Sequence, residues 1–276
     1  MTTTLPLTGH EVLDPARTTA LRAVGRRAAG FGTTADDLRT PTPVVLFVAT
    51  HHAVRTLVAE TFPALTSLVH LSQDVRVARP VAPDATLAVR PQVVAARPAP
   101  GGTDATVRCT VADADGDVAV LTAQVRLGGV EPPPGLPAVA TDRPTAPTER
   151  ADQFVHLGPV RHEAADVAEY ALLSGDDNPI HLDDDVARAA GFARAIVHGM
   201  ASVNAALEVA LRTVGAAAGD VRGLSVRFSA PTPVGETQTC EIACAPSGRV
   251  VTFRVAGPGG VSVKNGRLEL GTGDAS

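Results

Sequence analysis

The sequence predicts an α+β protein of two similar halves, in each of which an antiparallel sheet packs against a long helix. Residues 131–150 contain six prolines and little apolar content, which is typical of a stiff, extended linker. The order of a helix, a longer helix and several strands occurs on both sides of this linker. A strand motif also recurs, because residues 75–80 (Val-Arg-Val-Ala-Arg-Pro) resemble residues 226–231 (Val-Arg-Phe-Ser-Ala-Pro). We therefore expect an N-terminal half at 1–130, a linker at 131–150 and a C-terminal half at 151–276.

The first half is predicted to contain two helices and a set of strands. The pattern over residues 14–30 is helical and ends at a glycine, a common C-terminal stop. Residues 44–60 indicate a second helix, which we expect to be shorter than its counterpart and to begin with an apolar run instead of a cap. Strands at residues 106–114 and 118–127 close this half.

The second half repeats this order. A helix is predicted over residues 163–175, again with a glycine at its end. Apolar residues between Met200 and Val214 recur at helical spacing and indicate the long helix. Strands at residues 237–243, 249–256 and 261–270 follow. We expect the sheets of the two halves to pair edge to edge, because this covers exposed strand edges.

Composition excludes several classes of protein. The net charge is −5 and charged residues make up 19%, so no concentrated basic face for nucleic acid or a membrane surface is expected. No segment has the roughly 20 unbroken apolar residues of a membrane span, and residues 1–15 lack an apolar signal core. Cys109, Cys240 and Cys244 form neither a disulfide framework nor a metal-binding pattern. We expect a cytoplasmic protein without a bound metal.

Residues 174–183 (Ser-Gly-Asp-Asp-Asn-Pro-Ile-His-Leu-Asp) carry the clearest chemical signal. Pro179 forces Asn178 out of the helical region, and Asp183 can cap a short helix that ends near Gly191. The resulting loop can turn Asp176 and His181 toward one pocket. A carboxylate beside an imidazole can hold a water molecule and move its protons. The alternative is a polar turn whose side chains only satisfy backbone groups.

A second motif, Ile196-Val197-His198-Gly199-Met200, begins the long helix. Backbone N–H groups at a helix N-terminus favour developing negative charge, and a glycine there allows a ligand to approach closely. The alternative is a simple strand-to-helix entry with glycine as the cap. His198 faces either the core or the pocket, and we favour a structural role.

Together these motifs resemble the MaoC-like family of hotdog-fold hydratases and dehydratases. The resemblance implies a double hotdog, with two antiparallel sheets each wrapped on a helix and a degenerate N-terminal half. It also implies that Asp176 and His181 are the catalytic dyad and that the Gly199 N–H polarises a thioester carbonyl. The residues that it implies for the substrate site are Asn178, Ile180, Val197, His198 and Met200.

The implied reaction is the reversible hydration of trans-2-enoyl thioesters to (3R)-hydroxyacyl thioesters by a hydro-lyase. The substrate would be an acyl-CoA or an acyl carrier protein thioester, and no cofactor beyond that phosphopantetheine arm is implied. The chain would be a monomeric double hotdog or a homodimer. One alternative is a non-catalytic acyl-thioester-binding subunit. Another is a hotdog thioesterase, although Glu208 is the only carboxylate on the long helix and lies far along it.

The N-terminal half lacks the Asp-x-Asn-Pro-x-His motif and has Thr50-His51-His52 where the second half has Val197-His198-Gly199. We therefore expect it to act as a scaffold and as a wall of the acyl site. Its shorter helix predicts an acyl tunnel beneath residues 44–60, near His70, although His70 also suits a core histidine. Asp177 is expected to face solvent. Candidate contacts for coenzyme A phosphates are Arg188, Arg194 and Arg222.

Overall fold

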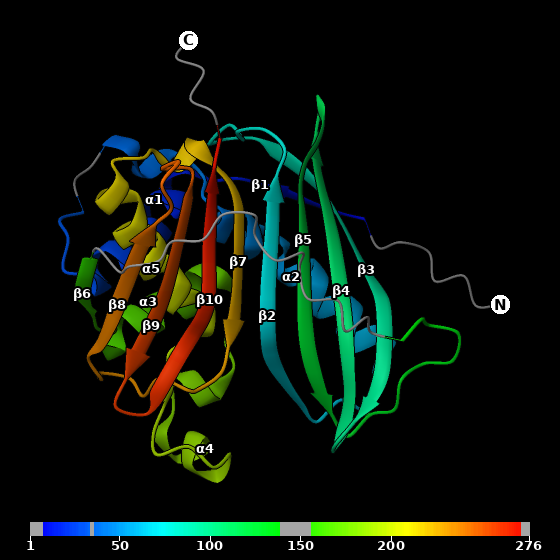
Figure 1. Cartoon of the computed structure of the whole chain (residues 1–276). Helices are drawn as coiled ribbons and strands as arrows, with labels where there is room; N and C mark the ends of the chain where they lie inside the picture. The colour runs from blue at the N-terminus through cyan, green and yellow to red at the C-terminus, as the bar shows by residue number, and fades with distance from the viewer. Residues whose placement is uncertain (1–7, 34–35, 139–155, 272–276) are drawn as a thin grey trace.

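A computed structural model describes residues 8–33, 36–138 and 156–271, whose strands form one ten-stranded antiparallel sheet (Figure 1). The first half contributes β1 (Gly9–Val12), β2 (Ser67–Val77), β3 (Thr86–Ala99), β4 (Gly102–Asp113) and β5 (Gly116–Gly128). The second contributes β6 (His156–Val160), β7 (Val221–Phe228), β8 (Gln238–Cys244), β9 (Val250–Gly257) and β10 (Gly260–Leu270). The α+β class and the predicted strands are confirmed.

The sheet is a duplicated unit joined at its centre. Its strand order is β1-β3-β4-β5-β2-β7-β10-β9-β8-β6, so each half has the same internal order and the two halves meet where β2 pairs with β7. Asp74 lies opposite Ser225 in this pairing. On either side, Gln73 pairs with Val226 and Val75 pairs with Leu224. The 151-residue offset of the sequence repeat converts one of these pairs into the other, because it relates Gln73 to Leu224 and Val75 to Val226. The predicted edge-to-edge pairing therefore generates one continuous sheet.

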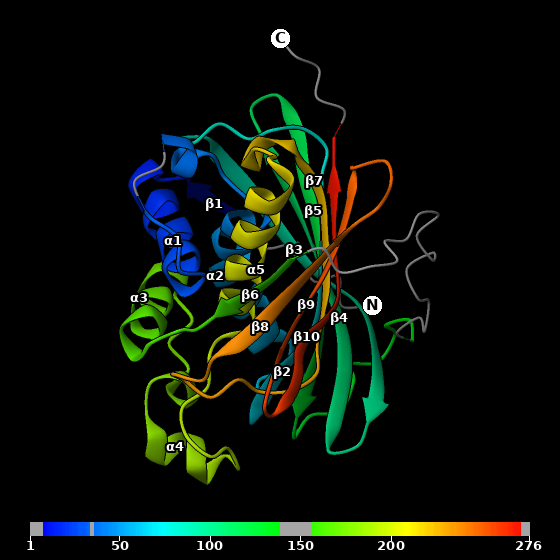
Figure 2. The same cartoon turned by 60° about the vertical axis from the view of Figure 1, so that its left-hand side comes forward.

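Four helices cover one face of this sheet. These are α1 (Pro15–Ala28), α2 (Pro43–Thr61), α3 (Ala164–Ser174) and α5 (Gly199–Val214), and Figure 2 shows them on the same side. A short helix, α4 (Asp184–Ala189), projects from one end (Figure 1). Every residue of α5 from Met200 to Leu211 is buried, so this helix is the centre of the core. The core cluster that contains α5 draws side chains from both halves.

The predicted form of the second N-terminal helix is wrong in two respects. Helix α2 has 19 residues, whereas its counterpart α5 has 16. It also begins with a regular cap, because the Thr42 hydroxyl accepts a hydrogen bond from the Val45 N–H and Pro43 occupies the first turn. The apolar run starting at Val44 hid this signal, since the cap lies just before it.

The longer α2 changes the comparison of the two halves. Thr50, His51 and His52 lie inside α2, well after its first residue Pro43, where backbone N–H groups bond within the helix. They are therefore not the structural equivalent of Val197, His198 and Gly199, which lead into α5. This correction supports a degenerate first half, because no free helix N-terminus exists at His51.

The rest of the chain bears on the other predictions. The part of the linker at residues 131–138 forms no helix or strand, and residues 139–155 lie outside the described residues. Cys109, Cys240 and Cys244 are free, and the first two are buried. Within the described part of the chain, no helix has the length and apolar character needed to cross a membrane.

Candidate active site

The loop that carries Asp176 and His181 folds as its local signals predict. Helix α3 ends at Gly175, whose φ of 72° lies in the left-handed region that glycine adopts easily. The Asn178 side chain then accepts a hydrogen bond from the Ile180 N–H and starts a single 3₁₀ turn, Pro179–His181. Asp183 accepts hydrogen bonds from two backbone N–H groups and caps α4. This sequence of caps places Asp176 before the turn and His181 at its end.

Asp176, His181 and His198 lie close together. A carboxylate oxygen of Asp176 and one ring nitrogen from each histidine all lie within 4.8 Å of one another. Two hydrogen bonds of about 2.8 Å to a single water molecule span a gap of this size. Asp176 and His181 are partly exposed, so solvent and a ligand can reach them, whereas His198 is buried. The arrangement can therefore hold one water molecule between an acid and a base.

The backbone fixes the tautomer of His181. Its Nδ1 lies 2.7 Å from the Ile196 carbonyl oxygen, which can only accept, so Nδ1 carries the proton. The Nε2 of the neutral ring is then unprotonated and can accept a proton. Ile196 is itself held, because its N–H donates to the Ile180 carbonyl at 3.1 Å. Burial lowers the pKa of His181, against the opposing effects of the Ile196 hydrogen bond and the Asp176 charge, and so favours the neutral form.

The start of α5 lies beside this pair. Gly199 is the first residue of α5, and the leading N–H groups of a helix have no partner within it. Two residues earlier, Val197 is fixed by a 2.8 Å hydrogen bond from its N–H to the Thr232 carbonyl. A Cβ added at Gly199 would lie 2.8 Å from the Phe228 ring, so only glycine fits here without a shift. The site can therefore stabilise a developing oxyanion.

The structure gives the other predicted site residues different positions. Val197 and Met200 are core residues, only 5% and 3% exposed, so they shape the site from behind and do not present a surface to a ligand. His198 is 2% exposed and contacts the dyad itself. Ile180 is partly buried, and its carbonyl is engaged by Ile196. Asn178 is exposed and its side chain serves the turn, which is the role the polar-turn alternative assigns.

Asp177 and the candidate arginines mostly have partners in the structure. Asp177 is 74% exposed on its side chain, as expected, and forms a 2.7 Å ion pair with Arg55 of α2. This contact lowers the pKa of Asp177 and keeps it ionised away from the dyad. Arg188 pairs with Asp184 and Asp185 on its own helix. Arg222 donates to backbone carbonyls of residues 219 and 221, whereas Arg194 is exposed.

The N-terminal half supplies aromatic and imidazole rings, of which the sequence pointed to His51 and His70 but not to Phe47. Phe47 of α2 stacks on His70 of β2 with ring centroids 5.7 Å apart, and His70 contacts Phe228 at 4.8 Å. His51 packs against Phe47 at 5.9 Å and feels the charge of Asp176. These rings occupy the place beneath α2 where a tunnel was predicted. The premise of that tunnel, a shorter helix, is also wrong, so an acyl chain can enter there only if the rings move.

The three-residue group does not suit a metal ion. Two histidines bound to one ion direct their in-plane lone pairs at a common point. The rings of His181 and His198 are instead stacked, with centroids 3.8 Å apart and planes 29° apart, so their lone pairs run side by side. Each ring also places one nitrogen against a backbone carbonyl. The geometry suits a bound water molecule better than a metal.

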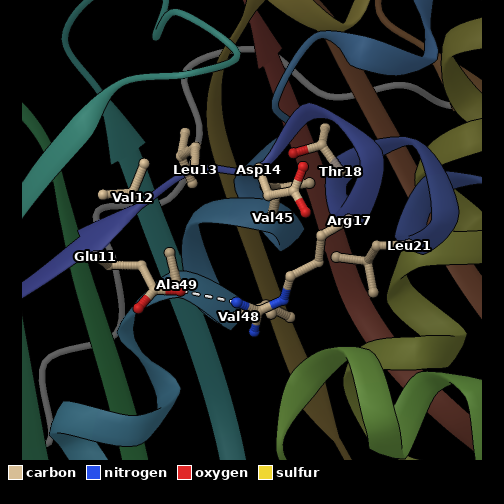
Figure 3. Close-up of a pocket in the computed structure, with 10 residues that line it drawn as sticks. All are labelled: Glu11, Val12, Leu13, Asp14, Arg17, Thr18, Leu21, Val45, Val48 and Ala49. Atoms are coloured by element: carbon tan, nitrogen blue, oxygen red, sulfur yellow. Dashed lines mark hydrogen bonds and ion pairs between the residues drawn. The ribbon is translucent and has the colours of Figure 1, made fainter.

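A separate hollow lies away from the dyad. It lies between β1, α1 and α2, and its volume of about 10 Å³ is room for about one water molecule (Figure 3). Its rim carries the 2.8 Å ion pair between Arg17 and Glu11, and its floor is apolar. None of its lining residues belongs to the motifs that the sequence predicts as the site.

The only carboxylate of α5 is committed elsewhere. Glu208 is 4% exposed and binds Arg22 of α1 inside the core. A hotdog thioesterase that used a carboxylate of the central helix would need that group beside the substrate. The ion pair therefore counts against the thioesterase alternative.

Comparison with known proteins agrees with this geometry. The "MaoC like domain" family matches residues 141–262. An (R)-specific enoyl-CoA hydratase of Aeromonas caviae is 37% identical over 82 residues, which are 30% of this chain and 61% of that protein. The crystal structure of a MaoC-like dehydratase from Phytophthora capsici superposes with a TM-score of 0.80 at 23% identity, covering 99% of this chain and 97% of that one.

A further structure identifies the fold. A conserved hypothetical protein of Mycobacterium tuberculosis, described as having a double hotdog fold, matches with a TM-score of 0.62 at 16% identity over 96% of this chain and 95% of its own. With its two five-stranded units joined at β2 and β7, the present chain is a double hotdog protein. The residues that match the MaoC like domain family lie mainly in its C-terminal half and include Asp176, His181 and Gly199.

Proposed function

We propose that the protein catalyses the reversible hydration of trans-2-enoyl thioesters to (3R)-hydroxyacyl thioesters. The observation that carries this proposal is the closeness of Asp176 and His181, with a carboxylate oxygen and a ring nitrogen within 4.8 Å of each other, beside the first N–H groups of α5. Similarity to an (R)-specific enoyl-CoA hydratase supports both the reaction class and the stereochemistry. The aligned region spans 61% of that relative, and both catalytic positions lie within the matched family domain.

In the proposed reaction, Asp176 accepts a hydrogen bond from the water and His181 Nε2 removes its proton. The water oxygen bonds to C3 while the C2–C3 double bond opens toward C2. The negative charge moves onto the thioester oxygen, which the Gly199 N–H meets, and one such donor is typically worth about 3–4 kcal/mol. The proton held by the dyad is then delivered to C2. One water molecule is thereby added, and the dyad returns to its initial state.

The rings at the domain junction bear on the substrate. Phe47, His70 and Phe228 fill the path beneath α2, so short enoyl groups fit without rearrangement and longer ones require the rings to move. The pantetheine arm would reach the site from the partly exposed side of Asp176 and His181. We propose no resident cofactor, since the thioester itself provides the carbonyl that the reaction polarises.

One assay separates this function from its rivals. The purified protein is incubated with a short trans-2-enoyl-CoA and with the same acyl group on an acyl carrier protein. Loss of the enoyl absorbance without release of free thiol is expected. Release of thiol would indicate a thioesterase. Binding with neither change would indicate a non-catalytic acyl-thioester subunit, and the comparison of the two thioesters identifies the carrier.

A further inference from the structure

We propose that His198 is the positioning residue of the dyad, holding Asp176 through its peptide carbonyl and His181 through the face of its ring. This inference rests on the proposed function of Asp176 and His181. The resemblance placed His198 among substrate contacts, but the ring is buried and directed at the two dyad residues.

The first contact fixes the backbone of Asp176. His198 Nε2 lies 3.0 Å from the Asp176 carbonyl oxygen, and because that oxygen can only accept, Nε2 carries the proton. On the amino side, the Asp176 N–H donates to the Ser174 hydroxyl at 3.2 Å. Asp176 is therefore anchored on one side to Ser174, the last residue of α3, and on the other to His198, the residue before α5. The His198 anchor sets the distance between the carboxylate and the start of α5.

The second contact supports His181. The two imidazole rings are stacked with centroids 3.8 Å apart, so His198 limits the tilt of the ring that the Ile196 carbonyl holds at its Nδ1 edge. Tyr170 of α3 packs against His198 at 4.9 Å and limits its movement in turn. His198 thus supports His181 directly, and Tyr170 supports His198 in turn.

The charge state of His198 is compatible with this role. Burial, reinforced by the neighbouring His181, lowers the pKa of His198 to about 4, against the opposing charge of Asp176. The titratable groups that face it are Asp176, His181, Tyr170 and, from α2, His51. His198 is therefore uncharged near neutral pH. A neutral ring does not repel the imidazolium that forms when His181 takes a proton from water.

The unused nitrogen of His198 is consistent with a fixed, inward-facing ring. In the neutral tautomer set by Asp176, Nδ1 is an acceptor, and it is buried without a hydrogen-bond partner among the described residues. An orphan acceptor of this kind is costly. It is tolerated here because the other nitrogen and the ring face are both engaged with the dyad.

Three substitutions separate the two contacts. His198→Gln keeps an N–H donor near the position of Nε2, His198→Phe keeps a ring for stacking, and His198→Ala removes both. We expect kcat for enoyl thioester hydration to fall 10- to 100-fold in the alanine variant and less in the other two, with KM within threefold of the wild type. Because the alanine variant admits water beside His181, the acid limb of its pH profile should move to higher pH. The phenylalanine variant should keep the limb in place.

A matched control uses another buried histidine that contacts the backbone of α5. His162 is 3% exposed and its Nε2 lies 3.2 Å from the Ala201 carbonyl, and in the described part of the chain it forms no hydrogen bond or ring contact with Asp176 or His181. His162→Gln should therefore leave kcat within twofold of the wild type. A folded His198→Ala variant with wild-type kcat would overturn the proposal. A rise in KM alone would overturn it too, because it would assign His198 to substrate binding.

A readout without catalysis distinguishes failure of this inference from failure of the proposed function. In ¹⁵N-histidine NMR spectra, assigned with His181→Gln and His198→Gln, His181 should be protonated at Nδ1 and His198 at Nε2. The His181 signal should titrate at higher pH in His198→Ala than in the wild type. An unchanged His181 titration overturns the positioning role even if the protein has no hydratase activity. Loss of activity on every enoyl thioester, with the NMR result as expected, overturns only the proposed function.

Discussion

Glu208 of α5 accepts two hydrogen bonds from the Arg22 guanidinium of α1, at 2.7 and 3.0 Å, inside the core. Both side chains are almost fully buried, with exposures of 1% and 4%. The pair connects the first helix of one half to the central helix of the other. Its two parallel contacts give it the fork geometry that makes arginine–carboxylate pairs specific.

We predict that Arg22→Leu destabilises the protein by about 3–5 kcal/mol, because it leaves the Glu208 charge buried and unpaired. Urea unfolding at neutral pH measures this change. The double variant Arg22→Leu/Glu208→Leu should recover most of the loss, since it removes both charges. If the single variant is as stable as the double variant, the pair does not hold the halves together as described.

The pH dependence of stability follows from a second buried group. Burial lowers the pKa of His162 from 6.5 to about 4, so the unfolded chain binds a proton that the folded chain refuses in this range. Stability should therefore fall as the pH drops from 6.5 toward 4, with His162 contributing about 2 kcal/mol of the loss between pH 7 and 5. His162→Gln should show a smaller loss than the wild type in urea unfolding at the two pH values. Equal losses in the two proteins would remove His162 as a cause.

The dyad itself allows a direct test. Asp176→Asn and His181→Gln should each lower kcat by about 10² to 10⁴-fold, which is the usual contribution of general acid–base groups. Both side chains are partly exposed, so the unfolding midpoint should change little. Enoyl-CoA hydration by stopped-flow absorbance gives the rates, and circular dichroism checks the fold. Turnover close to the wild type in either folded variant would remove that residue from the mechanism.

The pH profile of hydration has an expected direction. His181 must be unprotonated to accept a proton from water, and burial lowers its pKa below 6.5. The plateau of kcat/KM should therefore extend from neutral pH to somewhat below pH 6.5, and kcat/KM should fall only when the pH is lowered further. A plateau that already fails above pH 7 would show that His181 is not buried as in this structure, or that another group controls the rate.

Local signals explain why so much of the fold could be predicted. Gly175 and Asp183 act within a few residues of their own positions, so the sequence alone placed the end of α3 and the start of α4. The strand repeat was informative for a different reason. The 151-residue offset reappears in the register around Asp74 and Ser225, because both copies keep the same alternation of inward and outward side chains.

The contacts between the halves could not be predicted in this way. Arg55 lies 122 positions before its partner Asp177, and Arg22 lies 186 positions before Glu208. No local period connects such residues, since only the packing of α1 and α2 against the second half brings them together. The ring contacts of Phe47 and His51 could not be predicted for the same reason. Aromatic residues make up only 3% of the chain, so the rarity of Phe47 and Phe228 was the one usable signal in the sequence.

The last prediction concerns the glycine at the start of α5. A Cβ at residue 199 would lie 2.8 and 2.9 Å from two carbons of the Phe228 ring, closer than carbon atoms can approach. Gly199→Ala should therefore displace the ring or the helix start and move the N–H away from the thioester oxygen. We expect kcat/KM to fall 10-fold or more, since complete loss of an oxyanion donor typically costs about 3–4 kcal/mol.

Relief of that clash provides the control. In Gly199→Ala/Phe228→Leu the smaller side chain leaves room for the new methyl group, so the N–H can return to its position. Activity in the double variant should then exceed that of Gly199→Ala, even though Phe228→Leu alone removes a ring from the site. A double variant no more active than Gly199→Ala would mean that the glycine is needed for the approach of the substrate itself and not for its fit against Phe228.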